Sequence, residues 1–143
     1  MYIVPLFISF CLFLFVKKNK VILDTNFLLV PYQYCLDIFT EIDFLIGSSE
    51  FVISKGILNE LKEISKRKAK AGMAARFALK MIDKNKHRFT ILSSVEAADR
   101  WIVEYAKKYS IPVATNDKEI LRNLKHIKIK AIVVKSRSRL DIV

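Results

Sequence analysis

The sequence predicts an α/β domain: a three-layer α/β/α sandwich around a mainly parallel sheet of about five strands. Short apolar runs rich in valine and isoleucine alternate with longer segments in which apolar residues recur at three-four spacing. Most of the runs end in residues typical of turns and helix caps. Because a helical segment separates one strand from the next, we expect the strands to pair in parallel.

The first predicted strand, residues 20–23, ends in the turn and cap cluster Asp24-Thr25-Asn26. The further strands are predicted, in order, at residues 51–53, 89–92, 112–114 and 127–134. Helices are predicted at about residues 37–46, 54–66, 69–84, 93–109 and 117–124. Gly47 ends the first of these helices, Ser54 opens the second, and the capping-box spacing of Ser93 and Glu96 opens the fourth.

The composition fits one folded domain with a polyanionic partner. A chain of 143 residues, 52% of them hydrophobic, can bury its own core, which excludes intrinsic disorder. The formal net charge of +11 favours nucleic acid or an anionic membrane surface, although a solvated basic face is the alternative. Cys11 and Cys35 lie among apolar residues and suit a reducing cytoplasm, and His87 and His126 are expected at the surface.

Residues 1–16 form an apolar segment without a charge, followed by Lys17, Lys18 and Lys20. The segment is slightly short for a transmembrane helix and lacks the features of a secretory signal. Two interpretations stay open. It is a membrane anchor that keeps residues 17–143 in the cytoplasm, or a mis-annotated start upstream of a true start near Val16.

Four carboxylates, Asp24, Glu60, Asp99 and Asp117, are candidate site residues. Asp24 follows the first strand and Asp117 the fourth, and ligands of parallel sheets bind at the carboxyl ends of the strands. Either aspartate also suits a helix cap or a turn. Glu60 shares a helix face with Ile57.

Glu60 and Asp99 are both expected on core-facing stripes, Glu60 beside Ile57 and Ile64, and Asp99 beside Ile102 and Ala106. An unpaired carboxylate in apolar surroundings is costly, and a bound cation removes that cost. Oxygen ligands alone suit Mg²⁺ or Mn²⁺. Such a metal site hydrolyses phosphodiesters without a histidine or cysteine, and a basic face would bind the phosphates. Candidates for that face are Lys66, Lys70, Arg76, Lys80, Lys84 and the segment 135–139.

From about residue 18 to residue 135 the chain resembles a PIN domain. The similar stretches are VILDTNFLLVP, ILNEL, ADRWIVEYAKKYSIPVATND and the last strand. The resemblance implies a PIN-like fold with Asp24, Glu60, Asp99 and Asp117 as metal ligands and catalytic residues, and with Asn26, Thr115 and Asn116 as polar supports. It departs at Arg100, where many relatives have a further acid, and at residues 1–16.

The resemblance implies an endoribonuclease dependent on Mg²⁺ or Mn²⁺, either a VapC-type toxin with an antitoxin partner or an RNA-processing enzyme, often a homodimer. It is greatest to archaeal single-domain members and extends to small-subunit processome nucleases. A non-catalytic RNA-binding or ribosome-assembly module and a membrane-tethered effector are the alternatives. No aspartate follows the third strand, which excludes a receiver domain, and Gly47, Gly56 and Gly72 form no phosphate-binding loop.

Overall fold

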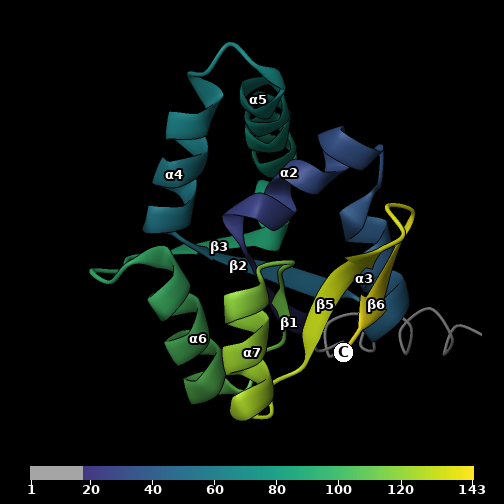
Figure 1. Cartoon of the computed structure of the whole chain (residues 1–143), viewed down its shortest axis with the longest axis vertical. Coiled ribbons are helices and arrows are strands. Elements are labelled where there is room, and N and C mark those ends of the chain that lie inside the picture. The colour runs from purple at the N-terminus through teal and green to yellow at the C-terminus, as the bar shows by residue number, and fades with distance from the viewer. Residues whose placement is uncertain (1–17) are drawn as a thin grey trace, which may run out of the picture.

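The computed structural model describes residues 18–143, which form a six-stranded sheet with helices on both faces (Figure 1). The strands are β1 (Asn19–Leu23), β2 (Ser49–Ser54), β3 (Phe89–Leu92), β4 (Val113–Ala114), β5 (Ala131–Lys135) and β6 (Arg139–Ile142). The helices are α2 (Thr25–Tyr34), α3 (Ile38–Ile46), α4 (Lys55–Ser65), α5 (Lys70–Lys84), α6 (Ala98–Tyr109) and α7 (Lys118–His126), with a 3₁₀ turn at Lys86–Arg88.

The order of the strands in the sheet is β3-β2-β1-β4-β5-β6. The first five strands pair in parallel, and β6 runs antiparallel to β5. The chain moves outward from β1 to β3 and then returns to place β4 on the other side of β1. The order therefore reverses between β1 and β4, and such a reversal opens a crevice at the carboxyl ends of the two strands. The predicted three-layer, mainly parallel α/β/α fold is confirmed.

The central strands are buried on both faces. Val21, Ile22 and Leu23 of β1 have no exposed surface, as expected for a sheet covered on both sides. Figure 1 shows α4 and α5 rising together with α2 on one side of the sheet, while α6 and α7 lie side by side on the other. These two helical groups flank the carboxyl ends of β1 and β4.

The helix α2 was not predicted. Every residue from Phe27 to Pro31 is buried, so the segment has no polar face and shows no helical period. A proline inside a helix normally argues against it, but α2 packs on α5 and this burial outweighs the lost hydrogen bond. Tertiary packing, rather than local pattern, makes this segment helical.

The C-terminal strand β6 was also not predicted, and the fifth strand starts later than expected, at Ala131. The turn between β5 and β6 has no glycine or asparagine, although Ser136 and Arg137 both have a positive φ. The sequence therefore lacks the usual hairpin signature at this position. The antiparallel edge strand makes the sheet six-stranded rather than five-stranded.

The capping box predicted at Ser93 and Glu96 is wrong. The helix α6 begins at Ala98, and Ala97 is its cap residue without a side-chain hydrogen bond. Val95 is fully exposed in the preceding loop, so an earlier start would bury no further apolar side chain. The remaining elements agree with the prediction apart from shifted ends.

The predictions for residues 1–16, a membrane anchor or a late start, lie outside the described residues. Within residues 18–143, none of the helices has the length and apolar character needed to cross a bilayer.

Candidate metal site at the carboxyl edge of the sheet

Asp24 lies in the crevice between β1 and β4. It directly follows β1, and its backbone N–H donates to the carbonyl of Ala114 at the end of β4 (3.1 Å). The side chain is only 4% exposed. Thr115 Oγ1 donates a hydrogen bond to Asp24 Oδ2 (2.9 Å). The two central strands thus hold this carboxylate from both sides.

Burial raises the pKa of Asp24 to about 6. Hydrogen bonds from Thr115 and from the backbone of Thr25 oppose the rise, whereas the negative charges of Asp99 and Asp117 add to it. Three of the predicted acids therefore lie within electrostatic reach of one another. A nearby cation would remove the cost of keeping Asp24 ionised.

Asp117 caps the helix α7. Its Oδ1 accepts hydrogen bonds from the backbone N–H groups of Glu119 (2.8 Å) and Ile120 (3.1 Å). Its own N–H donates to Thr115 Oγ1 (3.1 Å). The hydroxyl of Thr115 therefore accepts from Asp117 and donates to Asp24, which fixes the two residues relative to each other. The cap and the site prediction for Asp117 are compatible because the cap engages one carboxylate oxygen.

Glu60 reaches the same edge from α4. Its Oε2 accepts a hydrogen bond from Thr25 Oγ1 (2.8 Å), and Thr25 is the residue after Asp24. The expected apolar setting is wrong, because Glu60 is exposed. The buried stripe of α4 consists of Ile57, Leu61 and Ile64 and leaves Glu60 at its border.

Asp99 lies in the first turn of α6 and is also exposed, so the second core-facing prediction is wrong as well. Partial burial raises its pKa, and the charges of Asp117, Glu60 and Glu119 add to the rise. Asp99 thus connects Glu60 electrostatically with the pair Asp24 and Asp117. The structure brings all four predicted acids to one sheet edge.

Glu119 is an acid that the sequence reasoning missed. It lies in the first turn of α7 and contributes to the field at Asp99. Its position in the first turn of the helix that Asp117 caps was the available signal. Arg100 supplies no acid at the position after Asp99, and it pairs with Glu104 (2.9 Å). Glu119 supplies a further acid from α7.

Of the three predicted polar supports, Thr115 contacts two of the predicted acids. It is fully buried and bridges Asp24 and Asp117. Asn116 instead accepts a hydrogen bond from the backbone N–H of Val134 at Oδ1 (2.9 Å), which attaches β5 to the site. Asn26 is exposed in the first turn of α2.

The donor set fits a hydrated hard cation. Within residues 18–143, no three histidine, cysteine or acidic side chains are close enough together to enclose a metal ion. Mg²⁺ usually keeps several waters and needs one or two carboxylates, so a closed protein cage is not required. Asp24 is buried and lies near the like charges of Asp99 and Asp117, so its pKa is raised. A bound cation stabilises such an arrangement of charges.

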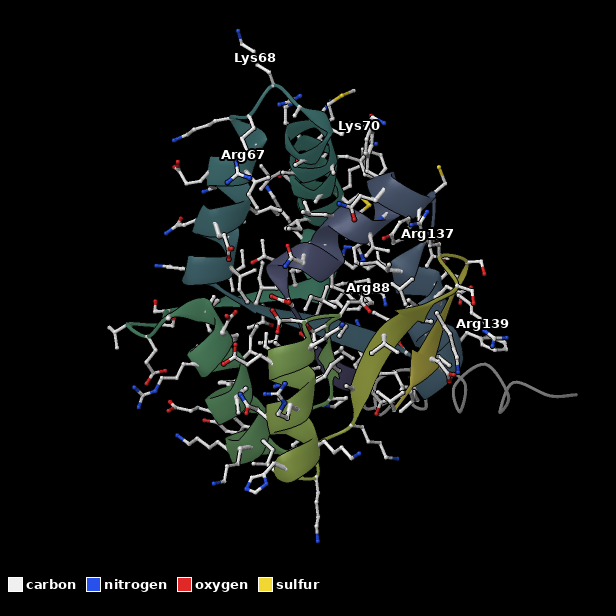
Figure 2. All side chains as sticks on the ribbon, viewed as in Figure 1. Arg67, Lys68, Lys70, Arg88, Arg137 and Arg139 are labelled. Atoms are coloured by element: carbon white, nitrogen blue, oxygen red, sulfur yellow. The ribbon has the colours of Figure 1, made fainter. Side chains whose placement is uncertain are left out.

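The predicted RNA-binding residues lie on α5 and on the turn between α4 and α5. Figure 2 labels Lys70 at this turn, at one end of the helical pair. Lys66 pairs with Glu63 (2.7 Å) in an exposed ion pair. Arg76 Nη1 donates to the carbonyls of Ser65 (2.6 Å) and Arg67 (3.1 Å), so its guanidinium also closes the end of α4. The other three, Lys70, Lys80 and Lys84, are exposed.

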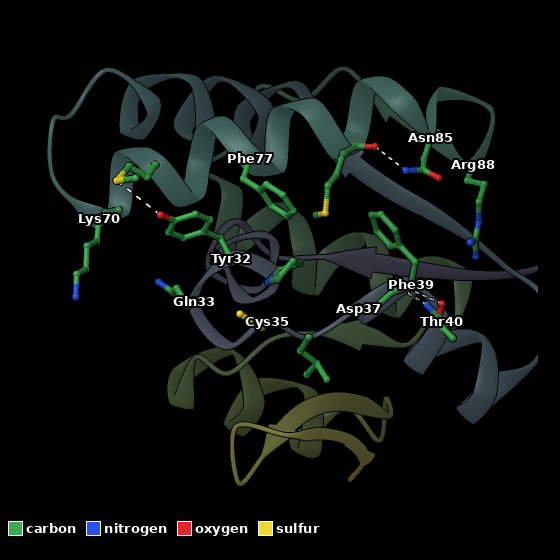
Figure 3. Close-up of a pocket in the computed structure, with 15 residues that line it drawn as sticks. Tyr32, Gln33, Cys35, Asp37, Phe39, Thr40, Lys70, Phe77, Asn85 and Arg88 are labelled. Atoms are coloured by element: carbon green, nitrogen blue, oxygen red, sulfur yellow. Dashed lines mark hydrogen bonds between the residues drawn. The ribbon is translucent and has the colours of Figure 1, made fainter.

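A separate groove of about 1310 Å³ lies between α2, α3 and α5 (Figure 3). The rings of Tyr32 and Phe77 lie there with centroids 6.0 Å apart and with their planes tilted by 52°. Of its lining residues only Asp37 is acidic, and Asp37 caps α3 through Thr40. The groove therefore contains none of the four predicted acids.

The comparisons with known proteins agree on one family. The family model described as "PIN like domain" matches residues 21–137. The chain is 32% identical to "Ribonuclease VapC9" of Archaeoglobus fulgidus, over 76% of this chain and 80% of the relative. It is 31% identical to "Ribonuclease VapC4" of Methanocaldococcus jannaschii, over 86% and 95%.

Among solved structures, the "PIN domain endonuclease Utp24" superposes with a TM-score of 0.71 and 26% identity, covering 86% of this chain and 90% of that one. A domain of a functionally unknown protein from Methanocaldococcus jannaschii shares the fold at a TM-score of 0.59 and 18% identity, over 83% and 93%. With the matched model spanning both strands of the crevice and the helices that carry the acids, the chain belongs to the PIN-like domain family.

Proposed function

We propose that this chain is an endoribonuclease that depends on Mg²⁺ or Mn²⁺ held by Asp24, Glu60, Asp99 and Asp117. The observation that carries the proposal is the buried Asp24, whose pKa of about 6 reflects burial and the charges of Asp99 and Asp117. Two relatives above 30% identity are named ribonucleases, which supports RNA as the substrate.

Three of the four carboxylates are oriented by hydrogen bonds within the protein. Thr115 anchors Asp24 through Oδ2, and the backbone of α7 anchors Asp117 through Oδ1. Thr25 anchors Glu60 through Oε2. In Glu60 and Asp117 a single oxygen accepts these hydrogen bonds, which leaves each carboxylate a second oxygen for a ligand. The bound cation would lower the pKa of a water and offset charge on the leaving oxygen.

The basic residues bring the substrate to this acidic edge. Lys66, Lys70, Arg76, Lys80 and Lys84 bind the RNA backbone in this proposal, so affinity falls steeply as salt is raised. Without such cations, the acids would repel the phosphates. The alternative is a non-catalytic RNA-binding or ribosome-assembly module. In that case the basic residues still bind RNA, and the acids have no catalytic role.

The decisive experiment measures cleavage of a labelled single-stranded RNA by the full-length protein. Cleavage requires Mn²⁺ or Mg²⁺ and stops in EDTA. Asp99→Asn reduces it strongly, while Asp83→Asn, which changes an exposed acid of α5 paired with Lys86, leaves it unchanged. RNA binding without cleavage in the presence of metal establishes the binding module instead, and equal loss in both variants excludes the proposed site.

The toxin role is the more specific form of the proposal. An antitoxin partner and a homodimer both need an exposed apolar surface, and Tyr32, Met73 and Phe77 provide one at the groove of Figure 3. We propose a cytoplasmic location for either role, with a membrane contact only through residues 1–16. Light scattering of the purified protein measures the oligomeric state directly.

A further inference from the structure

We propose that the tip of the β5–β6 hairpin, residues 135–139, is a second RNA-binding element that positions the strand leaving the acidic edge. This inference rests on the proposed nuclease function. The tip carries three cations, Lys135, Arg137 and Arg139, within a five-residue segment. Figure 2 shows Arg137 and Arg139 apart from the cations of the α4–α5 turn.

The topology places the base of this hairpin next to the acids. The strand β5 runs parallel to β4 with Ala114 opposite Ile132, and the N–H of Thr115 donates to the carbonyl of Ile132 (3.0 Å). The N–H of Val134 donates to Asn116, the residue between Thr115 and Asp117 (2.9 Å). The hairpin therefore passes Asn116 and continues beyond the carboxyl edge of the sheet.

The tip has a fixed conformation. Lys135 and Arg139 lie opposite each other in the backbone ladder of the hairpin. The N–H of Ser138 donates to the carbonyl of Lys135 (3.3 Å). Ser136 and Arg137 occupy the two central positions of this turn with φ values of 54° and 57°. Such turns favour glycine or asparagine, so two other side chains there are held at an energetic cost.

Arg137 presents a planar cation on an aromatic ring. Its guanidinium lies 5.7 Å from the centroid of the Tyr34 ring. Within residues 18–143, neither Arg137 nor Arg139 forms an ion pair, whereas Lys135 pairs with Asp141 (3.2 Å). A guanidinium held over a tyrosine ring offers both a charge for phosphate and a flat surface for a base. An acidic protein surface would need the charge alone.

Tyr34 links this cation to the acids through a single helix. Thr25, the residue after Asp24, begins α2, and Tyr34 ends it. A helix of ten residues is about 15 Å long. Proteins that bind single strands contact several nucleotides along the backbone with cationic and aromatic side chains. An RNA strand whose reacting phosphate lies near Asp24 can therefore extend along α2 and reach Arg137.

The test uses two glycine variants of the same turn. Arg137→Gly removes the cation and also relieves the backbone strain, whereas Ser136→Gly relieves the strain alone. Lys128→Gly is a third, matched variant, because Lys128 is an exposed cation with φ 59° at the opposite end of β5. All three variants are expected to melt at the wild-type temperature or above it.

Binding of a labelled 12-nucleotide single-stranded RNA to the full-length protein is measured in EDTA by fluorescence anisotropy over a salt series. We expect Arg137→Gly to weaken binding on the order of tenfold and to reduce the salt slope by about 0.7, the value for one phosphate contact on a single strand. Ser136→Gly and Lys128→Gly should bind like wild type. In cleavage with Mn²⁺, Arg137→Gly should raise KM more than it lowers kcat.

Equal affinities for Arg137→Gly and Ser136→Gly overturn the hairpin proposal, and the nuclease proposal survives if the wild type still cleaves. Dissociation of a dimer by Arg137→Gly with unchanged RNA affinity also overturns it, since the hairpin would then contact protein. A wild-type protein that neither binds nor cleaves RNA overturns the proposed function itself.

Discussion

Two regions of this molecule each hold an aspartate that accepts a hydrogen bond from a threonine hydroxyl. At the sheet edge, Thr115 donates to Asp24 (2.9 Å), and at the groove Thr40 donates to Asp37 (2.7 Å). The first pair is buried among other acids, while the second is exposed at the start of a helix. The hydrogen bond is the same, and the difference in chemistry comes from burial and from neighbouring charge.

The groove is therefore not where the chemistry is expected. The groove is lined mainly by apolar and aromatic side chains and suits a protein surface. At the acidic edge Glu60 and Asp99 are exposed, so a long polymer can reach them. We therefore place the proposed site by its converging charges rather than by cavity volume.

The largest expected effect is the loss of cleavage in Asp24→Asn. Removing the buried charge removes the central ligand of the proposed metal, so we expect activity to fall on the order of 10³-fold or more. Thermal unfolding monitored by circular dichroism should show an intact fold. Asp37→Asn is the matched control at the groove, because asparagine also caps helices and should leave activity unchanged. Full activity of Asp24→Asn would show that the buried aspartate at the sheet edge matters no more for cleavage than the exposed Asp37 at the groove.

The second prediction concerns the pH dependence of stability without metal. The pKa of Asp24 is raised in the folded state to about 6 from 3.8, so the folded protein binds the proton more tightly than the unfolded chain. Its contribution is fully present below about pH 4 and is lost as pH rises through about 6, on the order of 3 kcal/mol. Urea unfolding in EDTA at a series of pH values measures this change.

The pH-dependent part of the free energy of unfolding that comes from Asp24 should disappear in Asp24→Asn and persist in Asp37→Asn. Asp99 has the same sign, because its pKa is also raised, and it leaves a smaller residual slope in Asp24→Asn. Identical pH profiles for wild type and Asp24→Asn would mean that burial does not hold the proton on this carboxyl group.

A third prediction compares the two threonines. Thr115→Val removes the hydroxyl that donates to Asp24 and accepts from Asp117, so about 1–3 kcal/mol of stability should be lost. Cleavage should fall about 10-fold to 100-fold because the two acids lose their relative orientation. Thr115→Ser should recover both, and Thr40→Val, at the exposed pair, should leave cleavage intact. The readouts are urea midpoints and kcat.

The smallest expected effect is at the groove. Phe77 is 44% exposed, so Phe77→Ser should change the free energy of unfolding by less than about 1 kcal/mol and leave cleavage unchanged. If the groove binds a second copy or a partner, the same variant should weaken that association. Sedimentation velocity at several concentrations measures it, and a large loss of cleavage would show that the groove and the acidic edge are coupled.

The predicted elements were recognised where the local pattern and the tertiary environment agree. The helix α5 has apolar residues at three-four spacing, and its buried residues include Ala74, Ala78 and Ile82 of that stripe. The helix α2 has no such period because it is buried on nearly all sides, and β6 follows a turn without the expected residues. Both misses occur where the environment overrides the local signal.

The sequence by itself determined that strands and helices alternate and that Asp24 and Asp117 follow two strands of one sheet, because parallel strands end at a common edge. It could not determine the surroundings of Glu60 and Asp99, since both lie at the border of an apolar stripe. Only the tertiary structure decided these, by packing α4 and α6 so that their acids face the crevice. It also decided the burial of Asp24, because the order of the strands places β4 and Thr115 beside it.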